Sequence, residues 1–417
     1  MTAPGDGWAW RRQGAPAGAA VTGVLLLAVG LVLAHPEIAV LGAPLVLLAA
    51  GSIRRPAGLA GVRTEVEGAG GSLRARVEVV APAGVELVVV RVAAYGEPPR
   101  VLVVPPSHAV LDAALPVLHS GPQDVLRAEA ALVAPAAAAV AVLPPAVART
   151  TIGVDAEPLP ALPLPSVLTG RPGSHTARRA GEGVEFRDLA VFTPGDRLRR
   201  IDWRATARLA SVDLLVRRTA ATAEAAAVIL VDSRVDVGAV IAEWSRNRAG
   251  RKGRSALDVA RSAAVSLAAA YLAAGDRVAF HDVASSARSV RSGGGRRQLE
   301  RIRAAVAATS ARDTGIVALP PLPSASVVLL LSTFLDDEPL RIARLQLAAG
   351  NRVLGIDVLP PADLRGADAH VRSAHRIVLL ERTERLGRLG ALGVEVVPWA
   401  GEDRAAALLA AARPGRR

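Results

Sequence analysis

The sequence predicts a multidomain protein in which a transmembrane helical hairpin is followed by an all-β domain and then by an α/β domain with a parallel sheet. Three observations predict this order. Two long uncharged segments lie near the N-terminus, short alternating segments follow them, and continuous apolar segments alternate with amphipathic helices in the second half. With 417 residues, of which 51% are hydrophobic, the chain is long enough for two or three domains that each bury a core.

The helical hairpin is predicted over residues 14–55, after a cytoplasmic tail of residues 1–13. Residues 14–34 are uncharged and about long enough to span a bilayer, and residues 38–53 form a second, shorter apolar segment. Arginines flank the outer ends of both segments and none lies between them, so we expect both termini and the soluble domains to be cytoplasmic, in a multi-pass protein of the cell membrane. A cleaved signal peptide is the alternative, and the second apolar segment argues against it.

Residues 61–156 contain short segments in which apolar and polar residues alternate, separated by Gly/Pro turns at hairpin-like intervals. This pattern predicts an all-β sandwich of immunoglobulin-like size. No group of residues suited to catalysis occurs in it. The next segment, residues 157–165, contains four prolines and predicts a semi-rigid linker, because proline sustains neither a helix nor a central strand.

The second half of the chain, residues 221–417, alternates between buried strands and amphipathic helices, which predicts a parallel sheet covered on both faces. The carboxyl ends of its strands meet at one edge, where a ligand site is expected. The expected strands are residues 227–232, 277–282, 326–332, 352–359 and 394–398, and the expected helices are residues 257–274, 297–308, 339–349, 383–392 and one that begins at residue 402.

Composition excludes several kinds of site. The chain has no cysteine, which excludes disulfides, zinc–thiolate sites and cysteine nucleophiles. Its seven histidines are scattered without the spacing of metal ligands. The net charge of +12 comes almost entirely from arginine, which indicates compositional bias. Nucleic-acid binding would rest on that charge alone, so we expect no nucleic-acid partner.

The most informative segment runs from Phe186 to Arg208, where turn, charge and aromatic residues are concentrated. One interpretation is a buried charge cluster that clamps the loop to the sheet, with Trp203 packed beneath it, and the sequence favours this one. The other is a partner-binding surface, because Arg and Trp are favoured anchors in interfaces. In both cases the residues that form the site are Pro194, Gly195, Asp196, Arg199, Arg200, Asp202, Trp203 and Arg208.

This segment, within residues 166–220, resembles the signature of the bacterial domain of unknown function 58 (DUF58) family. The family's usual Arg-x-Tyr before Pro-Gly-Asp is replaced here by Ala190-Val191-Phe192. The resemblance implies that a von Willebrand factor A-like domain follows. Relatives are commonly encoded with MoxR-type AAA+ ATPases and sometimes with transglutaminase-like membrane proteins, which implies a non-enzymatic adaptor in a chaperone-like or cell-envelope assembly system. The alternative is a metal-dependent hydrolase, although the sequence has no recognisable nucleophile and base.

The von Willebrand factor A-like fold usually holds a divalent cation with Asp-x-Ser-x-Ser and with Thr and Asp residues from later loops, because hydroxyls and carboxylates suit Mg²⁺. In this chain Asp232 is present, but Arg234 and Asp236 occupy the two serine positions and Thr333 stands where an aspartate is expected. We therefore predict no cofactor. Instead, the Arg234 guanidinium takes the place of Mg²⁺ and bridges Asp232 and Asp236.

Overall fold

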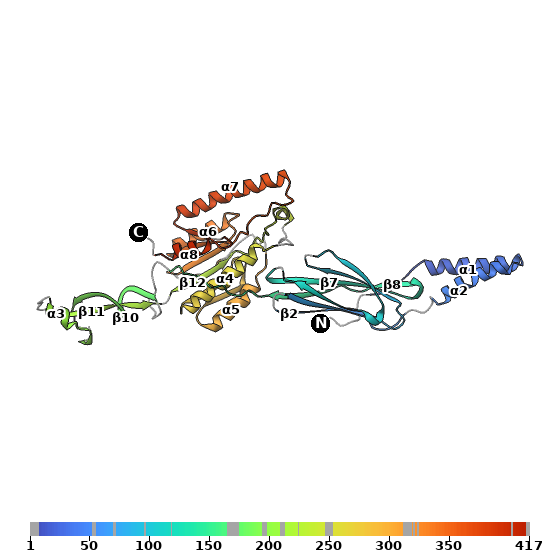
Figure 1. The fold of residues 1–417 in the computed structure, drawn as a ribbon, viewed down its shortest axis with the longest axis horizontal. Helices are drawn as coiled ribbons and strands as arrows, with labels where there is room; N and C mark the ends of the chain where they lie inside the picture. The colour runs from blue at the N-terminus through green and yellow to red at the C-terminus, as the bar shows by residue number, and fades with distance from the viewer. Residues whose placement is uncertain are drawn as a thin grey trace. The chain divides into compact units, whose positions relative to one another are not determined.

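In the computed structural model the chain folds into two compact units (Figure 1). Unit 1 comprises Met1–Leu118 and Gln123–Thr150, and unit 2 comprises His119–Pro122 and Thr151–Arg417. The structure describes residues 8–51, 56–69, 72–95, 97–117, 119–164, 175–193, 198–208, 213–223, 225–246, 253–311, 319, 322, 325–401 and 403–413.

Unit 1 begins with a short strand, β1 (Trp10–Arg12), and two apolar helices, α1 (Ala15–Val32) and α2 (Pro36–Gly51). The two helices pack closely through glycine. A Cβ atom on Gly30 would lie 2.5 Å from the Ala39 backbone nitrogen, and one on Gly42 would lie 2.5 Å from the Gly23 carbonyl oxygen. Such contact between backbones needs residues without side chains, so glycine fixes the geometry of this helical pair.

Two antiparallel sheets form the rest of unit 1. One has the order β1-β8-β7-β4-β5, with β9 also paired to β7, and the other has the order β2-β3-β6. In β3 the residues alternate strictly between exposed and buried, as expected for a strand with one face on a core. The strands are β2 (Gly61–Ala69), β3 (Ser72–Val80), β4 (Leu87–Ala94), β5 (Arg100–Val104), β6 (Val110–Pro116), β7 (Gly121–Val133), β8 (Ala139–Val142) and β9 (Ala146–Ile152).

Unit 2 is built on a six-stranded sheet of order β14-β13-β12-β15-β16-β17. Its strands are parallel except β14, which the sequence analysis missed and which runs antiparallel at the edge. The strands are β12 (Ala226–Val231), β13 (Arg277–Asp282), β14 (Ser285–Gly293), β15 (Val327–Ser332), β16 (Arg352–Asp357) and β17 (Glu395–Pro398), and the helices are α4 (Ala256–Ala273), α5 (Arg296–Ala307), α6 (Glu338–Ala348), α7 (Ala369–Ala391) and α8 (Arg404–Ala412).

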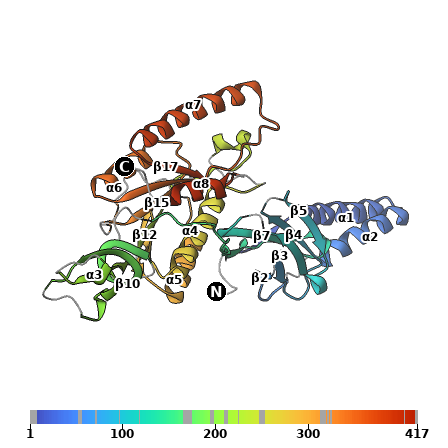
Figure 2. The same ribbon diagram turned by 60° about the vertical axis from the view of Figure 1, so that its left-hand side comes forward.

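Helices cover both faces of this sheet, as predicted (Figure 1, Figure 2). Ile229 and Val231 of β12 belong to the buried cluster that includes α4, α5 and α8, whereas Val228 and Leu230 belong to the cluster that includes α6 and α7. Successive residues of a strand point to opposite faces, so a continuous apolar strand supplies both cores. The result is a mixed α/β unit in which the carboxyl ends of the parallel strands meet at one edge of the sheet, between the two helical layers.

The proline-rich segment that was predicted to be a linker packs against unit 2. Leu159 and Leu162 contact the core cluster of α4, α5 and α8. The Glu157 carboxylate lies 2.7 Å from a guanidinium nitrogen of Arg404, and the Tyr271 hydroxyl donates a hydrogen bond to the Pro163 carbonyl. These contacts make the segment part of the second unit: its leucines pack against the core, and its carbonyls accept hydrogen bonds from the sheet domain.

Candidate functional site

Carboxylates gather at the carboxyl ends of the central strands of unit 2. Asp282 ends β13, Asp232 follows β12, and Asp357 ends β16. The parallel register pairs Val231 with Leu331, which places Asp232 beside Ser332 at the end of β15. The Asp232 backbone N–H continues the ladder by donating to the Leu331 carbonyl at 2.9 Å. This is the edge at which the sequence placed the candidate site.

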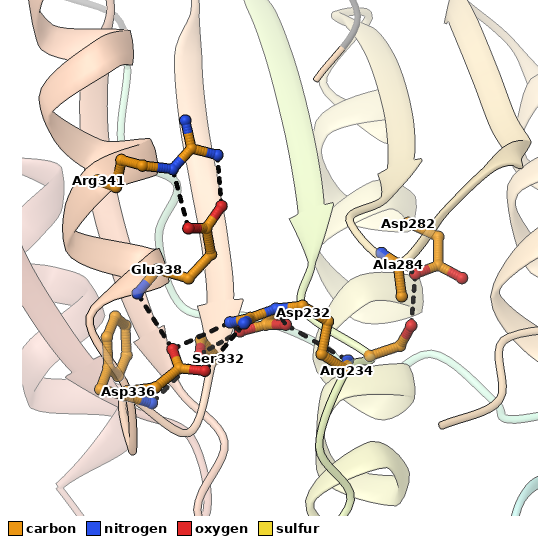
Figure 3. Close-up of polar contacts among 10 residues, drawn as sticks. Asp232, Arg234, Asp282, Ala284, Ser332, Asp336, Glu338 and Arg341 are labelled. Atoms are coloured by element: carbon orange, nitrogen blue, oxygen red, sulfur yellow. Dashed lines mark hydrogen bonds and ion pairs between the residues drawn. The ribbon is translucent and has the colours of Figure 1, made fainter. Parts of the chain in front are cut away.

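Arg234 lies at the centre of this edge and holds two carboxylates (Figure 3). Its Nε and Nη2 donate to the two oxygens of Asp232, each at 2.9 Å, and its Nη2 and Nη1 contact Asp336 at 3.0 and 2.9 Å. Burial lowers the pKa of Arg234, but hydrogen bonds to Asp232 and Asp336 outweigh it, so that its pKa is raised. The guanidinium is therefore a permanent positive charge between the two loops.

The predicted second partner of Arg234 was wrong. Asp336, from the loop after β15, takes the place that the sequence analysis gave to Asp236. Asp236 instead accepts a hydrogen bond from the backbone N–H of Leu257 at 2.9 Å, near the start of α4. Burial raises the pKa of Asp236 despite this hydrogen bond. Asp236 thus contributes to the start of α4 and not to the Arg234 cluster.

The loop after β15 is held in place from several sides. The Ser332 hydroxyl donates to Asp232 at 2.9 Å and accepts from the Phe334 backbone N–H at 3.2 Å. Phe334 is 1% exposed and has a φ of 55°, an uncommon value for a bulky residue that marks a strained turn. Arg382 of α7 donates from Nε to the Thr333 carbonyl at 2.9 Å. Thr333 is therefore fixed through its backbone, at the position where the resemblance implied a metal-site aspartate.

Asp232 has no free side-chain oxygen in this arrangement. Oδ1 accepts from Arg234 Nε, and Oδ2 accepts from Arg234 Nη2 and from the Ser332 hydroxyl. Within the described residues, no group of three or more His, Asp or Glu side chains is arranged to hold a metal ion. A cation at this edge would have to displace the guanidinium, and the absence of a cofactor remains a prediction to be tested by titration.

A second buried polar cluster, which the sequence analysis missed, surrounds Asp258 in the first turn of α4. His119 Nδ1 lies 2.5 Å from Asp258 Oδ2, and the backbone N–H of Ser120 donates to Oδ1 at 2.7 Å. Arg261 donates to the Ser120 carbonyl at 2.7 Å. Burial raises the pKa of Asp258, but the hydrogen bonds from His119, Ser255 and Ser120 outweigh it and lower the pKa to about 2. Ser255-x-x-Asp258 is a capping box that the sequence could have indicated, whereas nothing in it indicated His119.

The signature segment lies on a separate two-stranded sheet formed by β10 (His175–Val191) and β11 (Leu215–Ala223). Between these strands come the short helices η3 (Leu198–Arg200) and α3 (Trp203–Arg208). Ile201 is buried and bridges to Val216, and the Asp202 backbone N–H donates to the Leu215 carbonyl at 2.8 Å. Asp202 also caps α3, because its Oδ1 accepts from the Ala205 N–H at 2.9 Å. We call η3, Ile201, Asp202 and α3 together the ribbon tip.

The ribbon tip presents its basic and aromatic side chains to solvent. Trp203 is 65% exposed and Leu198 is 70% exposed. Arg199, Arg204 and Arg208 are exposed as well, and no carboxylate among the described residues pairs with them. The prediction that Trp203 packs beneath a buried charge cluster is therefore wrong, because Trp203 is exposed and Ile201 fills the buried position instead. Pro194, Gly195 and Asp196 lie outside the described residues, and Arg200 is half-buried.

Comparison with known proteins gives a match to one family model over the central part of the chain. No curated protein matches the chain. Residues 188–368, which include the ribbon tip, β12 to β16 and the Arg234 cluster, match the family model described as "Protein of unknown function DUF58". This match supports the resemblance noted in the sequence over residues 188–368.

Proposed function

We propose that the protein is a membrane-anchored, non-enzymatic adaptor that docks a MoxR-type AAA+ ATPase through the ribbon tip. The observation that carries the proposal is the tip itself, where the exposed Trp203 and Arg199, Arg204 and Arg208, which have no carboxylate partner among the described residues, stand on a backbone fixed by hydrogen bonds. An exposed tryptophan leaves a large apolar area in contact with water, which binding to a partner would bury. Tryptophan and arginine are among the residues that contribute most to binding at interfaces. The choice of ATPase rests on the family resemblance.

In this proposal the sheet edge is a metal-free docking surface of a von Willebrand factor A-like domain. In a metal-dependent domain of that kind, a partner's carboxylate completes the shell of the cation. Here Arg234 supplies the positive charge, and Asp336 keeps a side chain that is 44% exposed. Since the guanidinium is already hydrogen-bonded to both carboxylates, the loop is preorganised and no ion is required.

The anchoring part of the proposal rests on the N-terminal hairpin, which would span the bilayer beside an immunoglobulin-like sandwich. Two described helices, α1 and α4, are long and apolar enough to cross a membrane, but α4 is mostly buried in unit 2 whereas α1 is mostly exposed. Close packing through glycine is typical of membrane helices, which gain no hydrophobic stabilisation from each other. The apolar side chains of α1 and α2 that are more than half exposed are Val21, Val24, Leu25, Leu31, Val32, Val40, Leu41 and Leu47.

The experiment is a pull-down from detergent-solubilised native membranes, with and without ATP, using the tagged full-length protein. We expect an AAA+ ATPase to co-purify with the wild type and to be lost with Arg199→Ala. Arg365→Ala is the matched control, because the Arg365 side chain is also exposed but lies on another surface. Equal recovery of the ATPase with all three proteins would exclude the ribbon tip as the docking site, and its absence from all of them would exclude the partner.

A further inference from the structure

Unit 1 has one end that adjoins the helical hairpin, and the strand registers define which loops lie there. Arg12 pairs with Ala139, Leu87 pairs with Val133, and Val88 pairs with Val104. In the second sheet Gly61 pairs with Val80, and Glu78 pairs with Val110. The connections that reach this end are therefore residues 56–60, 81–86, 105–109 and 134–138, and we call them the hairpin-end loops.

The hairpin is joined to this end without a spacer. Only Gln13 and Gly14 lie between β1 and α1, and Gln13 continues the sheet by donating to the Ala138 carbonyl at 3.0 Å. The indole nitrogen of Trp10 donates to the Pro56 carbonyl at 3.1 Å, which ties the beginning of α1 to the segment that leaves α2. The short helix η2 (Pro135–Ala137) contacts both helices.

The length of α1 matches the thickness of the hydrocarbon core with no residues to spare. Its 18 residues span about 27 Å, slightly less than the roughly 30 Å of a hydrocarbon core, so the first residue of α1 must lie at the hydrocarbon edge. Two extended residues reach about 7 Å, which is about the thickness of one headgroup layer. A β-sheet joined so closely to a spanning helix must therefore have its near end within the headgroups.

The composition of the hairpin-end loops suits that position. Glu86 is the only charged residue among them, and its carboxylate accepts a hydrogen bond from the Ala136 N–H at 2.9 Å. Leu59, in these loops, is 64% exposed, which is unfavourable for an apolar side chain in water but favourable in a lipid environment. The opposite end of the same sheets carries ion pairs instead, between Arg100 and Glu97 at 3.6 Å and between Arg149 and Asp124 at 2.8 Å. The composition of the hairpin end therefore suits a lipid environment, whereas that of the opposite end suits water.

We infer that the hairpin-end loops form a lipid-facing surface that seats unit 1 in the headgroup layer of the bilayer. This inference rests on the proposed membrane anchor. Trp10 lies beside these loops, because its indole nitrogen donates to the Pro56 carbonyl, and Trp8 packs edge to face against it with ring centroids 6.1 Å apart; together they match the aromatic belt of membrane proteins. The exposed Arg11 and Arg12 beside them fit anionic headgroups.

The test uses the absence of cysteine from the chain, which allows single labels to be introduced. Ser107→Cys and Leu59→Cys place an environment-sensitive fluorophore on the hairpin-end loops. Ser72→Cys is the matched control, since it is the same exposed serine substitution at the opposite end of the sheets. The labelled full-length proteins are reconstituted in phosphatidylcholine–phosphatidylglycerol vesicles, and quenching by lipids with a nitroxide near the headgroup is measured.

We expect strong nitroxide quenching and a blue-shifted emission for the labels at residues 59 and 107, and neither for the label at residue 72. If vesicle flotation shows that the protein is inserted but all three labels behave like the control, the lipid-facing surface is refuted while the anchor stands. Protection from an aqueous quencher without nitroxide quenching would show a protein cover and also refute it. If the protein does not float with the vesicles, the anchor itself fails.

Discussion

Arginine serves two opposite purposes in the sheet edge and in the ribbon tip. At the edge, Arg234 is 13% exposed and uses three nitrogens on two carboxylates. At the tip, Arg199 and Arg204 are exposed and no described carboxylate pairs with them. Both regions lie within the residues that match the family model. The comparison teaches that the net charge of a chain does not identify a binding surface, because a buried arginine is a structural part and only an unpaired one is available to a partner.

The largest effect is expected from Asp232→Ala. This change removes the buried partner of the Arg234 guanidinium and leaves it only Asp336, whose side chain is 44% exposed, so the free energy of unfolding should fall by about 3 kcal/mol. Urea unfolding of the detergent-solubilised protein, followed by a spectroscopic signal from unit 2, measures the free energy of unfolding. The double variant Asp232→Ala, Arg234→Ala removes the arginine charge as well, and should lose clearly less than the sum of the two single changes. Additive losses would mean that the pair is not coupled.

A smaller effect of a different kind is expected from Trp203→Ala. The side chain contributes little to folding because it is exposed, so the free energy of unfolding should change by less than about 0.5 kcal/mol. Affinity for the co-purified ATPase should fall by roughly 2 kcal/mol, or about 30-fold, if Trp203 anchors the interface. Leu345→Ala on α6 is the control, because Leu345 is 49% exposed outside the tip. A stability loss without a binding loss would return Trp203 to a structural role.

The pH dependence of stability should come from Asp258. Its pKa is lowered from the ordinary 3.8 to about 2 in the folded state. A lowered pKa of a carboxyl group stabilises the fold at pH values above the unfolded pKa, and this stabilisation is lost as the pH falls from about 4 to about 2. The loss should be about 2 kcal/mol. Unfolding midpoints measured across this range should fall for the wild type and be flatter for Asp258→Asn. Parallel curves would show that other carboxyl groups dominate.

Much of the α/β fold could be predicted, because its strands are continuous apolar segments and its helices have one apolar face. Predicted strands 277–282 and 352–359 correspond to β13 and β16. The first half of α7, before residue 383, was missed because Ile377 to Leu380 are consecutive apolar residues without helical spacing, and Ile377 and Leu380 are exposed. The ribbon of β10 and β11 was missed because turn and charge residues conceal its alternation.

The candidate site was predicted in position but only partly in composition. Asp232, Arg234 and Thr333 do lie at one edge, since the carboxyl ends of parallel strands meet there. Asp336 was not predicted as the partner because it is 102 residues away from Arg234 in the sequence. The position of Asp336 depends on the strained turn at Phe334 in the loop after β15, which the sequence does not reveal. The strand register alone would have brought Ser332 to Asp232. The contact of His119 with Asp258 depends on tertiary packing that no local pattern encodes.

The smallest effect is expected from Asp363→Ala, which tests whether burial decides the importance of an arginine–carboxylate pair. Arg365 lowers the pKa of Asp363 to about 2, as the neighbours of Asp258 do for that residue. Arg365 Nη2 lies 2.7 Å from the Asp363 carboxylate, but the Arg365 side chain is 91% exposed. Water screens an exposed pair and hydrates either charge when the other is removed. We therefore expect no measurable change in the free energy of unfolding, in contrast to Asp232→Ala. A loss comparable to that of Asp232→Ala would show that burial does not distinguish the two kinds of arginine.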